Sequence, residues 1–110
     1  MRVLILPEVR EYFKELQIIL YEKYYFGHED AAQKYTDELL EDILTNLPTK
    51  LHKPAPEHFD KFGKNMKYAA FRKNRHTCWY AFFKTYNRNG EKVFLVRYIA
   101  NNHTVAQYLS

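Results

Sequence analysis

The chain has 110 residues, enough to bury one hydrophobic core and too few for two, so we expect a single domain spanning residues 1–110. The 17% aromatic content and the three glycines exclude a disordered low-complexity chain, and one cysteine, Cys78, excludes an internal disulfide and a cysteine-rich zinc site. Residues 1–47 carry five basic and ten acidic side chains, whereas residues 48–110 carry twelve basic and three acidic ones, so the second half either attracts polyanions or acidic proteins or is basic only for solubility.

The chain opens with a short apolar run that follows Arg2 and ends at Pro7. This pattern predicts a strand followed at once by a helix, because proline is tolerated in the first helical turn. The run is shorter than the apolar core of a secretory signal, and no later stretch approaches the roughly 18–20 apolar residues of a membrane span. We therefore expect a cytoplasmic protein without a membrane partner.

Two amphipathic helices are predicted next. Apolar residues recur at helical spacing from Val9 to Tyr24, with charged residues on the opposite face. Gly27 interrupts this pattern, and Glu29-Asp30 then place negative charge at the N-terminal end of a second helix. The apolar stripe of that helix runs from Ala32 to Leu47, and Pro48 ends it. The short break predicts an antiparallel helical hairpin.

The remaining chain is predicted to form a sheet. Residues 48–66 hold three prolines and a glycine without a clear period, which predicts a loop. Strands are predicted over residues 67–73, 77–86 and 93–100, with Asn87-Arg88-Asn89-Gly90 as the turn between the last two. Residues 101–110 fit either a short tail strand or a last helical turn. The order predicts an α+β fold, β-α-α-β-β-β, with the helical hairpin packed on one face of a mainly antiparallel sheet.

Strand alternation sorts the side chains to the two faces of this sheet. In the first of the three late strands, one set is Tyr68, Ala70 and Arg72, and the other is Ala69 and Phe71. In the last strand, one set is Val93, Leu95, Arg97 and Ile99, and the other is Phe94, Val96, Tyr98 and Ala100. Alternation leaves open which set is buried. An arginine inside an apolar strand must face the open side of the sheet or be paired if it is buried.

The acidic helical hairpin before a basic sheet, together with the closing stretch Phe94 to Leu109, resembles the RelE/ParE toxin superfamily. Shorter stretches resemble its plasmid stabilisation branch: Leu47-Pro48-Thr49-Lys50, Phe59, Gly63-Lys64-Asn65 and Thr77-Cys78-Trp79-Tyr80. The resemblance spans nearly the whole chain. It implies the toxin of a bacterial toxin–antitoxin system, a growth inhibitor that a small cognate antitoxin protein neutralises.

The family implies two possible activities. RelE-like members are ribonucleases that cut messenger RNA on the ribosome, and ParE-like members poison DNA gyrase. The nuclease class uses strand-borne lysines and arginines plus a C-terminal tyrosine, whereas this chain has Tyr68 and Ala70 in place of the lysines and Thr77 and Asn102 near the arginine positions. Only Tyr108 matches. The missing residues favour a ParE-like toxin over a RelE-type ribonuclease and leave enzymatic activity open, with a rearranged ribonuclease or a non-toxic binding module as alternatives.

Basic residues of the sheet are the candidate contacts to a target or polyanion: Arg72, Lys73, Arg75 and Arg97. The alternative for the first three, which precede His76, is a solvated turn. Arg97, His103 and Tyr108 are the catalytic candidates, since an imidazole beside a phenol can act as an acid or base. A plain exposed histidine is the alternative for His103.

Other patterns are weighed against simpler explanations. We expect no metal and no cofactor, because His52 and His58 around Glu57, and His76 with Cys78, lack the paired spacing of zinc sites. The run Trp79, Tyr80, Phe82 and Phe83 fits either a platform for unpaired bases or a core strand. A tyrosine-rich helix face fits either a partner-binding surface or the edge of the core: Tyr12, Tyr21, Tyr24, Tyr25 and Tyr35.

Overall fold

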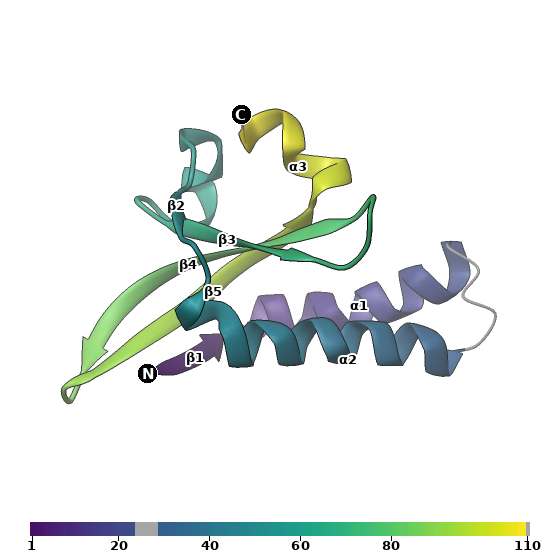
Figure 1. Ribbon diagram of the computed structural model, residues 1–110, viewed down its shortest axis with the longest axis horizontal. Helices are drawn as coiled ribbons and strands as arrows, with labels where there is room; N and C mark the ends of the chain where they lie inside the picture. Colours follow the sequence, from purple (N-terminus) through teal and green to yellow (C-terminus); the bar gives the residue numbers. More distant parts are fainter. Residues whose placement is uncertain (24–28, 110) are drawn as a thin grey trace.

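The computed structural model describes residues 1–23 and 29–109 and confirms the α+β fold with a helical hairpin on one face of a mainly antiparallel sheet (Figure 1). The elements in chain order are β1 (Arg2–Ile5), α1 (Pro7–Lys23), α2 (Glu29–Asn46), η1 (Leu47–Thr49), β2 (Lys53–Pro54), η2 (Glu57–Phe62), β3 (Lys67–Arg72), β4 (Cys78–Arg88), β5 (Glu91–Asn101) and α3 (Asn102–Leu109). The expectations for Tyr24, Tyr25 and Gly27 lie outside the described residues. No helix in the described ranges is long and apolar enough to cross a membrane.

The sheet has five strands in the order β1-β5-β4-β3-β2. The first strand pairs in parallel with β5, from Arg2 opposite Val93 to Ile5 opposite Val96, and all other neighbours are antiparallel. The β4–β5 hairpin turns at Asn89 and Gly90, whose φ angles of 52° and 79° are the positive values that favour such residues in two-residue turns. The long hairpin extends beyond the helices at its turn (Figure 1).

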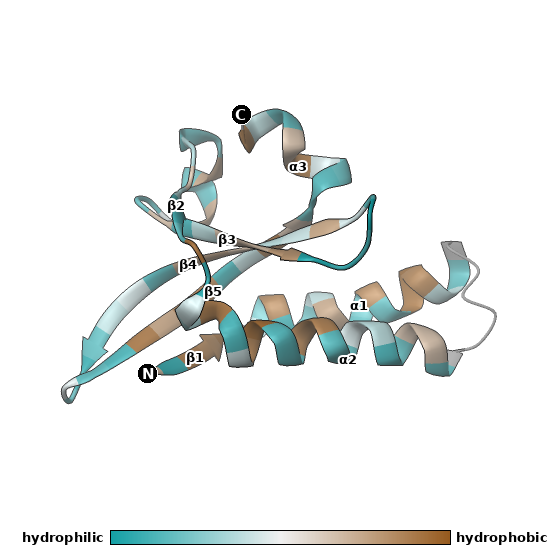
Figure 2. Cartoon of the chain, in the orientation of Figure 1, coloured by the Kyte–Doolittle hydropathy of each residue, from teal (hydrophilic) through white to brown (hydrophobic). Residues whose placement is uncertain are grey.

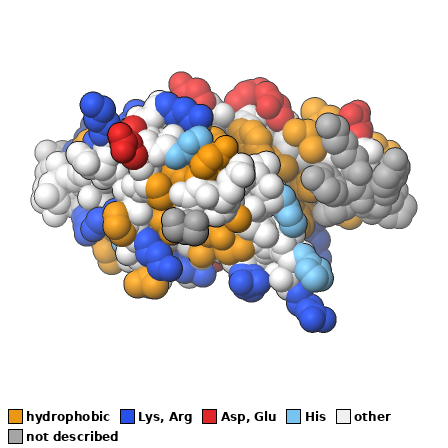
Figure 3. Space-filling model, turned by 90° about the horizontal axis from the view of Figure 1, so that it is seen from above, with side chains coloured by type: hydrophobic (Ala, Val, Ile, Leu, Met, Phe, Trp, Pro, Cys, Tyr) orange, Lys and Arg blue, Asp and Glu red, His pale blue; other side chains and the backbone are white. Residues whose placement is uncertain are grey.

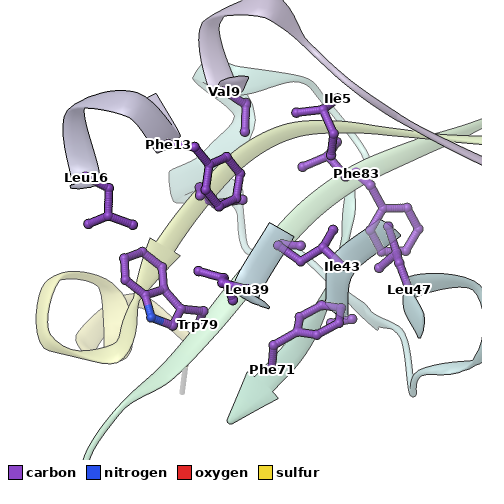
Figure 4. Packing of buried hydrophobic residues seen from close by; sticks show 14 of the residues in the cluster. Ile5, Val9, Phe13, Leu16, Leu39, Ile43, Leu47, Phe71, Trp79 and Phe83 are labelled. Carbon is purple, nitrogen blue, oxygen red and sulfur yellow. The ribbon is translucent and has the colours of Figure 1, made fainter. Parts of the chain in front are cut away.

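The larger core lies between the helical hairpin and the sheet. In Figure 2 both helices are banded in brown and teal, as expected for helices with one apolar face. Their buried residues include Phe13, Leu39 and Ile43, which point toward Phe71 and Trp79 of the sheet (Figure 4). Burying each of these side chains stabilises the fold by roughly 1.5–3 kcal/mol.

The opposite face of the sheet is partly covered by η2 and α3, a layer that the sequence analysis missed (Figure 1). A second cluster forms there around Phe59 of η2, Phe82 of β4 and Val105 of α3. The rings of Phe59 and Phe82 stack with centroids 4.3 Å apart. The predicted loop over residues 48–66 therefore contains η1, β2 and η2, and the last residues adopt the helical alternative.

The alternation predicted for the last strand is wrong beyond Val96. Phe82 pairs with Tyr98 but Phe83 pairs with Val96, so Arg97 is an extra residue that forms a β-bulge. One extra residue exchanges the two faces, and Ile99 consequently joins Val96 in the helix-side core. The alternating faces predicted for β3 are confirmed, with Ala69 and Phe71 facing the helices and Tyr68 facing away.

Candidate functional site

A pocket of about 500 Å³ opens on the face of the sheet away from the helical hairpin. We call it the open-face pocket, and its lining residues are Lys50, Leu51, Lys53, Tyr68, Ala70, Arg72, Cys78, Tyr80, Ala106 and Leu109. Figure 3 looks onto this side of the molecule. Lys and Arg side chains there surround a hydrophobic centre, while most acidic side chains in view lie along one edge.

Strand pairing brings the floor of the pocket together. Alternation along β3 turns Tyr68, Ala70 and Arg72 to this face, and Tyr80 of β4 lies opposite Ala70 in the ladder. The small side chain of Ala70 leaves the depth of the pocket open. Lys53 reaches the rim because β2 pairs it with Tyr68.

The electrostatics of the pocket favour anions. Its basic lining residues are Lys50, Lys53 and Arg72, of which Lys50 holds its Nζ 4.8 Å above the Phe71 ring, and no acidic side chain lines it among the described residues. Burial raises the pKa of Tyr80, and Cys78 and Tyr68 raise it further, while the Arg72 guanidinium acts in the opposite direction. Tyr80 is therefore a neutral phenol at physiological pH, able to donate a hydrogen bond to an anionic oxygen.

The four basic residues predicted to contact a target do not share one surface. Arg72 lines the open-face pocket, where its Nη1 lies 3.4 Å from the carbonyl oxygens of Asn74 and Arg75. Lys73 turns to the helix side and is only 16% exposed, with its Nζ 3.8 Å from Glu38 and 4.9 Å above the Tyr35 ring.

The other two basic candidates lie elsewhere. Arg75 is exposed in the turn between β3 and β4. Arg97, on the β5 bulge, donates its Nε–H to the Phe62 carbonyl at 2.7 Å, and a Cβ at Gly63 would lie only 2.8 Å from that nitrogen. Arg97 therefore holds the end of η2 against the sheet.

The catalytic candidates Arg97, His103 and Tyr108 are held by different neighbours. The His103 Nε2 lies 3.4 Å from the Thr77 hydroxyl, and the Tyr108 ring stacks on His58 with centroids 3.6 Å apart. Within the described residues, no contact joins any two of these three candidates. A ribonuclease site built from them lacks the convergence that acid–base catalysis needs.

The histidines weighed as metal ligands have structural contacts. His52 bonds through Nε2 to the Leu47 carbonyl at 2.8 Å and packs edge-on against Phe83, and His58 stacks on Tyr108. The part of the chain that the structure describes holds no group of three His, Cys, Asp or Glu side chains that could bind a metal ion. Cys78 is buried and contacts the Trp79 carbonyl.

The aromatic residues divide between the two faces of the sheet. Trp79 and Phe83 are buried on the helix side, and Phe82 is buried on the opposite side. Tyr80 alone of the predicted stacking run lines the open-face pocket. On the helices, Tyr21 is exposed, whereas Tyr12 and Tyr35 are half-buried at the edge of the core.

Sequence reasoning missed Lys50 and Lys53 as members of the site. The shared face of Tyr68, Ala70 and Arg72 was visible in the alternation of β3. The two lysines reach that face only because a two-residue strand, Lys53–Pro54, adds to the sheet after an irregular segment. A strand of two residues is too short to produce a periodic pattern in the sequence.

No protein-family model matches this chain, and no curated protein and no solved structure match it.

Proposed function

We propose that this chain is the toxin of a type II toxin–antitoxin system, a ParE-like growth inhibitor that acts on DNA gyrase through its open-face pocket. A cognate antitoxin neutralises it. The resemblance of the sequence to the RelE/ParE superfamily supports this proposal, and so does the acidic helical hairpin packed against a basic sheet. The observation that carries it is the open-face pocket, whose charged lining residues, Lys50, Lys53 and Arg72, are all basic among the described residues.

The pocket is better suited to binding than to cleavage. Cations at its rim attract an acidic surface from a distance and accelerate association, an effect that salt screens. Cleavage of RNA needs a group that removes the proton of the 2′-hydroxyl, and the raised pKa of Tyr80 disfavours the phenolate that would do so. The pocket therefore supports inhibition by occupation of a target.

The test is induction of the gene in a bacterial host, with growth and plasmid supercoiling as readouts. We expect growth arrest and altered supercoiling. The triple variant Lys50→Ala/Lys53→Ala/Arg72→Ala should relieve both effects. The matched control Lys34→Ala/Lys64→Ala/Arg88→Ala removes the same charge from exposed positions outside the pocket and should remain toxic. If induction left growth and supercoiling unchanged, the proposal would fail.

A second candidate is a ribosome-dependent ribonuclease that uses the same pocket. The convergence of Arg72, Tyr80 and Tyr68 favours it, since a guanidinium can stabilise charge on a reacting phosphate. Primer extension on ribosome-bound message distinguishes the candidates, because cuts that disappear with Arg72→Ala indicate the ribonuclease. Growth arrest with altered supercoiling and intact message indicates the gyrase inhibitor, and stable complex formation without any growth phenotype indicates a non-toxic binding module.

A further inference from the structure

A second cavity, of about 700 Å³, lies along the edge of the sheet beside β5. We call it the edge groove. One wall is apolar and comes from the junction of β1 and α1 with Leu6, Val9 and Tyr12. Thr104 of α3 and Phe62 also line the groove, and residues 97–101 of β5 form its floor. The edge groove shares no lining residue with the open-face pocket.

The floor of the groove is an unpaired strand edge. The pairing of β1 with β5 ends at Ile5 and Val96, and one further bond joins the Leu6 amide to the Val96 carbonyl at 3.1 Å before the chain enters α1. Beyond that point β4 pairs with β5 on one side, and no described strand pairs with it on the other. Five residues, about 16 Å of extended backbone, are thus available to another strand.

The two edges of the sheet differ in their protection. The β2–β3 edge carries Lys53, Pro54 and Lys67, and lysine and proline at an edge hinder pairing with other chains. The free part of β5 begins at the Arg97 bulge and continues with Tyr98, Ile99 and Ala100, without lysine or proline and beside an apolar cavity. A free strand edge beside a preformed groove is the arrangement that peptide-binding domains use for strand addition.

Arg97 indicates the charge of the occupant. It is half-buried at the groove, and its one hydrogen bond within the described residues joins its Nε to the Phe62 carbonyl. None of the ion pairs between described residues involves it, although Glu8 lines the same groove. A guanidinium in a partly apolar site gains most from a carboxylate, which two Nη groups can hold.

We propose that the edge groove binds an extended segment of a partner protein. The segment pairs with residues 97–101 of β5, inserts apolar side chains against Leu6, Val9 and Tyr12, and places an aspartate or glutamate on Arg97. Main-chain hydrogen bonds supply affinity, and the alternate side chains supply specificity. This interaction goes beyond the proposed toxicity and is independent of it.

The test uses 12-residue peptides selected from a displayed random library against the full chain. Enriched peptides should alternate apolar residues, contain an acidic residue, and slow hydrogen exchange of the amides of residues 97–101. Replacing the peptide acid by its amide should weaken binding about fivefold or more on the unaltered protein. Thr104→Arg, which fills the groove, should weaken binding about tenfold or more, whereas Gln107→Arg, exposed on the same helix and outside the groove, should not.

Three results would overturn the proposal. These are no enrichment, enriched peptides that protect the open-face pocket instead, and protection of residues 97–101 that depends on protein concentration alone, which would assign the edge to a second copy of the chain. None of these three results bears on growth arrest, so the proposed peptide binding and the proposed toxin function can each fail without the other.

Discussion

The two faces of the sheet are built in different ways. On the helix side, two long helices present regularly spaced apolar residues, and the core between them and the sheet is continuous. On the other side, the short elements η2 and α3 anchor themselves through a few aromatic and aliphatic side chains and leave part of the face open as a basic pocket, which is lined by residues 50–53, β3, β4 and α3. The comparison indicates that one face supplies stability while the other has room for binding.

The largest expected effect is on the helix side. Phe71→Ala removes a fully buried ring that packs toward α2 and should lower the free energy of unfolding by about 3–5 kcal/mol. Urea denaturation followed by circular dichroism measures the change. Leu51→Ala, 76% exposed at the rim of the open-face pocket, is the control and should change the stability by less than about 0.5 kcal/mol. Equal losses of unfolding free energy in the two variants would contradict the conclusion that the helix side supplies the stability.

A smaller effect is expected where η2 meets the β5 bulge. Gly63 has a φ of 149°, and a Cβ there would lie 2.8 Å from the Arg97 Nε. Gly63→Ala should therefore cost about 1–3 kcal/mol through backbone strain and displacement of the Arg97 side chain. Gly90→Ala provides a control for positive φ alone, since nothing lies within 4 Å of its Cβ. The Gly63 variant should be the less stable of the two in thermal unfolding, and the reverse order would exclude the steric explanation.

Shortening the side chain of Val105, which anchors α3, should lower the local stability only on the face of the sheet away from the helical hairpin. Val105 is 4% exposed in the smaller cluster, and Val105→Ala should cost about 2 kcal/mol from the lost apolar burial. Hydrogen exchange should quicken in α3 and η2 while the amides of β3 and β4 keep their protection. Faster exchange throughout the sheet would show that the two faces unfold as one unit.

The smallest effect concerns alkaline pH. Burial raises the pKa of Tyr35, Tyr80 and Tyr98 above the ordinary value of 10.0. Because the folded state holds these protons more tightly, their contribution to stability is present below pH 10 and is lost as the pH rises through the raised values. Absorbance at 295 nm follows the ionisation. Arg72→Ala should delay the ionisation of Tyr80 further, and an earlier titration would contradict the proximity of the two groups.

The helix side was predictable because its signals are periodic. The apolar stripe from Ala32 to Leu47 repeats at helical spacing, and both of these residues are buried as expected. The alternation of β3 likewise assigned Phe71 and Tyr68 to opposite faces. The β5 bulge was not predictable, because one extra residue at Arg97 leaves the composition of the strand unchanged while it exchanges the faces beyond.

The candidate site was only partly visible in the sequence, for a related reason. Arg72 lies on a regular strand, so alternation placed it correctly with Tyr68. Lys50 and Lys53 belong to an irregular segment that joins the sheet through the two-residue strand β2, and a strand this short has no period to detect. Lys73 follows β3 and turns to Glu38 on α2, a contact that depends on how the hairpin packs.

The parallel pairing of β1 with β5 also determines when the sheet can form during synthesis. Arg2 pairs with Val93, 91 residues later in the chain, so β1 has no neighbouring strand until that residue has been made. At about 5–20 residues per second, the first strand leaves the ribosome roughly 5–18 seconds before its partner exists. The sheet therefore closes only after β5 has been synthesised, and throughout that interval the nascent chain lacks both the finished pocket and the finished groove.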